Sequence, residues 1–106
     1  MPFQLRLTRE AEEDLHQLFD FIIQRELHRN NNSDLQMAQA ALEAIEKGFE
    51  TLKLSPFSCR KSHQNPFLRE LIIAFGHSGY VALFEIENQD TVTIAAVRHQ
   101  NEDDYH

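Results

Sequence analysis

Three apolar runs in the C-terminal half constrain the fold most strongly. They cover residues 67–75, 80–87 and 91 to 97 or 98, and only the short segments 76–79 and 88–90 separate them. Connections this short allow each run to pair only with its neighbour in antiparallel fashion. The sequence therefore predicts a three-stranded antiparallel meander with an apolar face that another layer must cover.

Two amphipathic helices are predicted ahead of the meander. The first runs from Arg9 to about Leu27, behind a Thr8 cap and an acid-rich first turn. The second opens with a capping-box pattern at Ser33 and Gln36 and is ended by Pro56. Its apolar residues step by three or four: Leu35, Ala38, Leu42, Ile45, Phe49 and Leu52. A short polar turn joins the helices, which indicates an antiparallel helical hairpin.

The N-terminal residues 3–7 alternate apolar and polar side chains, as a half-buried strand does. The predicted fold is therefore a single α+β domain over residues 1–106, in the order strand, helical hairpin, three-stranded meander (β-α-α-β-β-β). Both helices pack on one face of the sheet, and the other face stays partly exposed as a binding surface. Residues 55–66, with two prolines, are predicted to be a loop.

The net charge of −7 argues against a nucleic-acid-binding chain, because affinity for phosphate backbones depends on Lys and Arg. The acids gather in the first half, however, so a local cationic face in the second half is compatible with this charge. Cys59 is the only cysteine and is predicted to be a free, half-buried thiol. No apolar segment has the length of a membrane span, and the N-terminus lacks a secretory signal pattern, so a cytoplasmic location is expected.

Five segments in this order resemble the RelE/ParE superfamily of bacterial type II toxins: "LTREAEEDLHQLFDFI", "SPFSCRKS", "LREL", "GYVALFEIE" and "VRHQNEDDY". The resemblance covers essentially the whole chain, and the details favour the ParE-like branch. It implies a toxin that is neutralised by a cognate antitoxin and that inhibits DNA gyrase by protein–protein binding. It implies no cofactor, no metal and no direct DNA binding by this chain alone.

Two alternatives stay open beside the gyrase inhibitor. One is a ribosome-dependent mRNA endoribonuclease of the RelE kind, which would be metal-independent. The other is a relic that is no longer toxic and only binds its antitoxin.

Candidate target-binding residues are the basic groups of the second half: Arg60, Lys61, Arg69, His77, Arg98 and His99. In a ribonuclease, Arg60, Lys61, Arg69, Arg98, His99 and Tyr105 would supply the acid, the base and the phosphate contacts. Two departures from the ribonuclease pattern weigh against that chemistry. Val81 lies in the region where ribonuclease members carry an Arg, and three acids directly precede Tyr105. The gyrase-binding interpretation, without catalysis, is therefore favoured.

Structural roles compete with these assignments. Arg69 is equally suited to a salt bridge on the sheet, and Arg98 to tying the C-terminal tail down. His63, His77 and His99 lack the spacing of a metal site. The "GHSG" turn is attributed to turn geometry. For the antitoxin, the candidate residues are the apolar side chains least easily placed on the inner stripe of the first helix: Phe21, Ile23 and Leu27.

Overall fold

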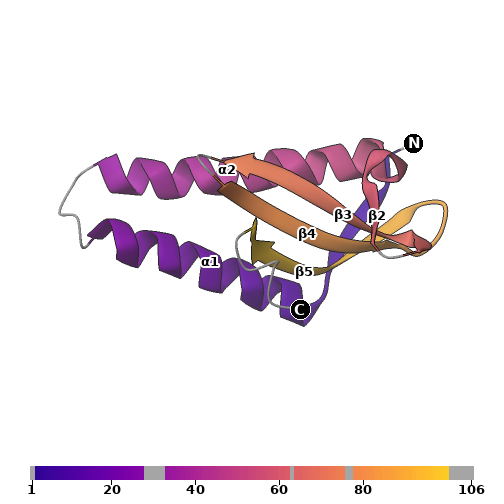
Figure 1. Ribbon diagram of the computed structural model, residues 1–106, viewed down its shortest axis with the longest axis horizontal. Helices are drawn as coiled ribbons and strands as arrows, with labels where there is room; N and C mark the ends of the chain where they lie inside the picture. Colours follow the sequence, from indigo (N-terminus) through magenta and orange to yellow (C-terminus); the bar gives the residue numbers. More distant parts are fainter. Residues whose placement is uncertain (1, 28–32, 63, 76–77, 101–106) are drawn as a thin grey trace.

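The computed structural model describes residues 2–27, 33–62, 64–75 and 78–100. It confirms the α+β fold and both helices of the hairpin (Figure 1). The elements are β1 (Gln4–Leu7), α1 (Arg9–Leu27), α2 (Ser33–Leu54), the 3-10 helix η1 (Pro56–Ser58), β2 (Arg60–Ser62), β3 (Asn65–Phe75), β4 (Ser78–Ile86) and β5 (Thr91–His99).

The sheet has five strands in the order β1-β5-β4-β3-β2. Strands β2 to β5 pair antiparallel in chain order, and the last three of them form the predicted meander. Strand β1 lies parallel to β5 at the edge of the sheet. A parallel neighbour requires a long crossover, which the helical hairpin and the meander supply. The first and last strands of the chain therefore lie side by side.

Thr8 joins β1 to α1 and confirms the predicted cap. The amide of Ala11 donates to Thr8 Oγ1 over 3.0 Å. The Thr8 hydroxyl in turn donates to the carbonyl of Ala95 over 3.1 Å. Ala95 lies at an irregularity of the β4–β5 register, where Leu83 faces Ala96 but Phe84 faces Ile94. One side chain thus starts the helix and satisfies the bulged strand.

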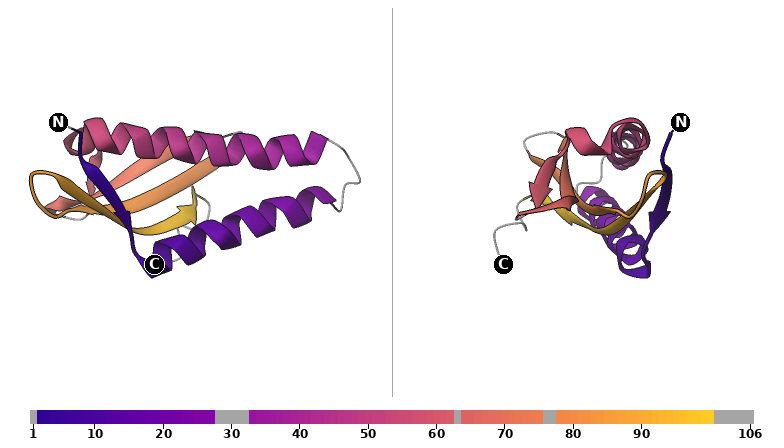
Figure 2. Two further views of the ribbon diagram at one scale, coloured as in Figure 1. Left: turned by 180° about the vertical axis from the view of Figure 1, so that it is seen from behind. Right: turned by 90° about the vertical axis from the view of Figure 1, so that its right-hand side faces the viewer.

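The core lies between the helices and one face of the sheet (Figure 2). Alternate residues of β4 face it, and among them Phe84 is a large side chain that is fully buried. Helix α1 packs on β5 and α2 packs on β3, so that Ala11 and Leu52 contribute to the same core from different helices. The opposite face carries Glu70, which lies in register with Leu83.

Residues 55–66 are not wholly a loop, and the prediction was wrong there. They contain η1 and β2, and β2 adds a strand to the edge of the meander. Strand β2 has only three residues, too few for a pattern of alternating side chains. It is defined by its pairing with β3, where Arg60 faces Glu70. This strand therefore depends on a tertiary contact and could not be predicted from the local sequence.

Candidate functional site

Arg69 of β3 is bound to backbone carbonyls. Its Nε donates to the carbonyl of Pro66 over 2.7 Å. Its Nη1 donates to the carbonyls of Phe57 (3.0 Å) and Cys59 (2.7 Å). The predicted structural role of Arg69 in a salt bridge is wrong, because its acceptors are carbonyl oxygens and not a carboxylate. Arg69 therefore fastens η1 and the start of β2 onto β3.

Two exposed phenylalanines, Phe57 and Phe67, lie beside this clamp; we call them the aromatic pair. Each is 52% exposed. Their ring centroids are 6.5 Å apart at an interplanar angle of 74°, an edge-to-face contact. The Arg69 guanidinium lies 5.2 Å from the centroid of the Phe57 ring, within the range of a cation–π contact. A third large apolar residue, Leu54, is 76% exposed at the end of α2, three positions before Phe57 in the chain.

Arg60 and Lys61 lie on β2 next to the same clamp. Arg60 Nε pairs with Glu70 Oε1 over 3.0 Å. Lys61 is exposed and lies in register with Arg69. The structure thus brings three of the predicted basic residues to one end of the sheet, with Lys61 on the face of Arg69 and Arg60 on the other face with Glu70. The aromatic rings beside Arg69 were not predicted from the sequence.

Arg98 and His99 lie in a second place, on β5. The Arg98 guanidinium forms an ion pair with Asp14 of α1, and Asp14 Oδ2 also accepts the amide of Val97 over 3.0 Å. The His99 ring packs edge-on against Tyr80, with centroids 5.8 Å apart. Strands β3 and β4 separate this group from β2, a backbone distance of roughly 15 Å at the usual strand spacing.

Asp14 is the residue that the sequence analysis missed. Its side chain is only 11% exposed, although it belongs to an acid-rich helix start. The signal was present: Asp14 follows Ala11 by three and precedes Leu18 by four, so it falls on the apolar stripe. A carboxylate on such a stripe requires a buried partner.

The residues predicted to bind the antitoxin are partly described. Phe21 is 57% exposed and Ile23 is half-buried. The side chain of Leu27 lies outside the described residues, as do His63, His77 and Tyr105. Within the described residues, no three His, Cys, Asp or Glu side chains gather as a metal site would need.

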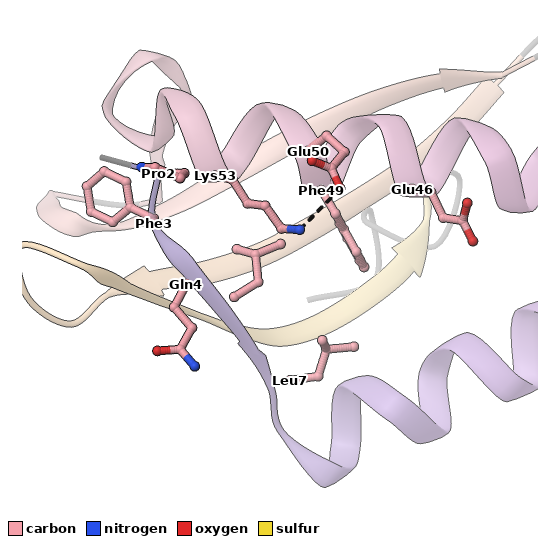
Figure 3. A pocket seen from close by; sticks show the side chains of 9 residues that line it. Pro2, Phe3, Gln4, Leu7, Glu46, Phe49, Glu50 and Lys53 are labelled. Carbon is pink, nitrogen blue, oxygen red and sulfur yellow. Dashed lines mark hydrogen bonds and ion pairs between the residues drawn. The ribbon is translucent and has the colours of Figure 1, made fainter.

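A groove of about 590 Å³ lies between β1 and α2 (Figure 3). Its lining is apolar at Leu5 and Phe49, and the Glu50–Lys53 pair lies on its rim. The amide of Gln4 donates to a carbonyl at the start of β5, so the amide of Leu5 points away from β5. In the described sheet, β1 is an edge strand with this groove beside it.

Cys59 is half-buried, as predicted. Burial raises the pKa of its thiol, and this outweighs the opposite effects of Arg69 and of a hydrogen bond with Ser58, both of which lower that pKa. A raised pKa keeps the thiol protonated at neutral pH, which is unlike a nucleophilic cysteine.

Residues 5–104 match the family described as ParE toxin of type II toxin-antitoxin system, parDE. The chain belongs to this ParE toxin family. The fold is similar to a solved structure described as "Chromosomal ParDE TA system from P. aeruginosa", with a TM-score of 0.67. That similarity covers 92% of this chain and 95% of the other, at 17% sequence identity.

No match was found among curated proteins. Membership of the ParE family makes this chain a toxin of a type II toxin–antitoxin system, and such a system implies a cognate antitoxin as partner. None of the described helices has both the length and the apolar character of a membrane span.

Proposed function

We propose that this ParE-family toxin inhibits DNA gyrase by protein–protein binding and that its cognate antitoxin neutralises it in the cytoplasm. The observation that carries the proposal is the end of the sheet formed by β2 and β3. There, the aromatic pair is exposed, and the exposed Lys61 of β2 lies in register with Arg69. Aromatic and Arg side chains at an exposed apolar patch are typical of protein interfaces.

The ribonuclease alternative receives less support from the geometry. Metal-free RNA cleavage needs a base, an acid and a phosphate contact around one scissile bond. The described candidates are instead divided between β2–β3 and β5. Arg69 already uses its Nε and Nη1 on three carbonyls, and Arg98 is paired with Asp14.

For the antitoxin we propose the hairpin end, through Phe21. Its side chain is 57% exposed on α1, in the half of the helix that leads to the hairpin connection. An amphipathic partner helix covers such residues when it lies along a helical surface. The groove beside β1 is a second surface on which the same partner can continue.

The first experiment is induction of the chain alone in a bacterial host, with DNA and protein synthesis followed by precursor incorporation over the first minutes. Early loss of DNA synthesis while protein synthesis continues is the expected result. Purified toxin is then added to gyrase in a supercoiling assay, with toxin mixed beforehand with its antitoxin as control. Early loss of protein synthesis would replace the proposal with the ribonuclease alternative, and unchanged growth with soluble protein would favour the relic.

A further inference from the structure

We propose that the aromatic pair, Phe57 and Phe67, is the hot spot through which the toxin docks on its protein target, and that Arg69 is the positioning residue that presents it. This inference rests on the proposed function only in that the target is a protein. It assigns the target contact to two residues without charge and gives the nearby cations a supporting role.

Exposure of these rings is the first observation. Phe57 and Phe67 each leave about half of their surface in water, side by side. Isolated exposed apolar residues are common, but a contiguous aromatic patch on a small protein typically marks an interaction site. Burying the remaining surface of both rings on a partner would supply about 2–4 kcal/mol in total at the usual transfer value.

Rigidity is the second observation. Arg69 restricts the backbone at this site. Its guanidinium binds the carbonyl of Phe57 and the carbonyl of Pro66, the residue before Phe67. The amide of Phe67 donates to Asn65 Oδ1 over 2.9 Å, which fixes the second ring's backbone as well. The backbone that carries both rings is thereby held in place before a partner arrives, which lowers the entropy cost of binding.

Charge defines the chemistry of the partner. Lys61 is exposed and lies in register with Arg69, which holds the aromatic pair, and Arg60 is 55% exposed even in its pair with Glu70. We therefore expect an apolar pocket rimmed by carboxylates on the target. A nucleic acid fits less well, because one face of Phe57 is already covered by Arg69 and the rings meet edge to face.

Phe21 provides a matched control, since it is a similarly exposed phenylalanine on α1. The C-terminal half of α1 and strand β2 lie toward opposite ends of the molecule (Figure 1). The test compares Phe57→Ala, Phe67→Ala and Phe21→Ala for growth arrest, gyrase binding and antitoxin binding. Each change at the aromatic pair should weaken target binding by about 30-fold, as a hot-spot truncation does. It should leave binding of an antitoxin fragment confined to the hairpin end within about threefold of the wild type, a change worth less than 1 kcal/mol.

Arg69 is tested by two substitutions. Arg69→Lys keeps the charge but loses the planar fork that reaches several carbonyls. Binding of the target should fall as far in Arg69→Lys as in Arg69→Met, whereas Lys61→Gln should mainly change the salt dependence of association. Rescue by lysine would overturn the positioning role and make Arg69 a direct charge contact.

The two proposals fail in different ways. If the wild type arrests growth without binding gyrase, the gyrase proposal is wrong, and the toxicity of the Phe57 and Phe67 variants still decides the docking surface. If those variants fold, by thermal unfolding, and remain fully toxic, the docking surface is wrong while gyrase inhibition stands. The docking surface would also be overturned if the Phe57 and Phe67 variants lost RNA binding and kept protein binding. A wild-type chain without toxicity would overturn it as well.

Discussion

At the scale of single residues, Asp14 links the first helix to the last strand. Its carboxylate accepts the Val97 amide and pairs with Arg98, and both side chains are less than one third exposed. Replacing Asp14 with Ala removes the acceptor of a buried amide and the carboxylate that pairs with Arg98. We expect a loss of about 3 kcal/mol in the free energy of unfolding, measured by urea denaturation.

The partner substitution provides the control. Arg98→Met in the Asp14→Ala background removes the charge that Asp14 had neutralised, so the double variant should recover part of that loss. Strict additivity of the two single changes would contradict a direct coupling between Asp14 and Arg98. The same cycle separates stability from toxicity, because neither residue touches the aromatic pair in the arrangement described above.

Cys59 makes a second prediction at this scale. Burial raises the pKa of its thiol in the folded chain, so the reactive thiolate is scarce at pH 7. Alkylation by iodoacetamide should therefore be slower than that of glutathione at pH 7–8, and its rate should keep rising with pH beyond the point where glutathione levels off. Unfolding in urea should abolish the difference. A folded thiol that reacts as fast as glutathione at pH 7 would contradict the burial effect.

At the scale of elements, the β3–β4 hairpin depends on Gly79 for a reason other than the predicted turn geometry. Gly79 lies within β4, in register with Ala74, and a Cβ there would come 2.0 Å from the carbonyl oxygen of Ile73. Gly79→Ala should therefore cost about 3 kcal/mol of stability or more, because the backbone must move. Urea denaturation measures the loss.

Gly48 of α2 is the matched control. A Cβ there would come 2.9 Å from Ile73 Cγ1, a side-chain atom, so the neighbour can give way more easily. Alanine also gains about 1 kcal/mol of helix propensity over glycine. Gly48→Ala should therefore destabilise the chain much less than Gly79→Ala. Equal losses at both positions would show that the backbone contact at Gly79 is not decisive.

The elements also show how far a sequence can predict this molecule. Helix α2 was predictable because six apolar residues recur at helical spacing, and β3 to β5 because short turns leave few pairing choices. Strand β2 and the parallel pairing of β1 with β5 depend on contacts between distant segments, which no local pattern records. The candidate site was predicted in part for the same reason. Arg60, Lys61 and Arg69 were selected because they are basic. Phe57 and Phe67 become candidates only through their exposure, which the sequence does not reveal.

At the scale of the whole molecule, the two proposed surfaces lie toward opposite ends of an elongated body. The principal extents are 47 × 31 × 24 Å, with the C-terminal end of α1 at one end and β2 at the other (Figure 1). An antitoxin anchored at Phe21 that also covers the aromatic pair must span most of this length. That needs about 14 extended residues, at about 3.3 Å each, or about 30 helical ones at 1.5 Å.

Neutralisation should therefore require more of the antitoxin than binding does. We expect an antitoxin fragment confined to the hairpin end to form a complex with the toxin but to leave gyrase inhibition and growth arrest intact, since Phe57 and Phe67 stay open. The full-length antitoxin should abolish both activities. Hydroxyl-radical footprinting of the two rings reports their coverage directly, with Phe21 as the internal reference. Complete neutralisation by a fragment that protects Phe21 and leaves both rings reactive would show that inhibition does not act by covering the aromatic pair.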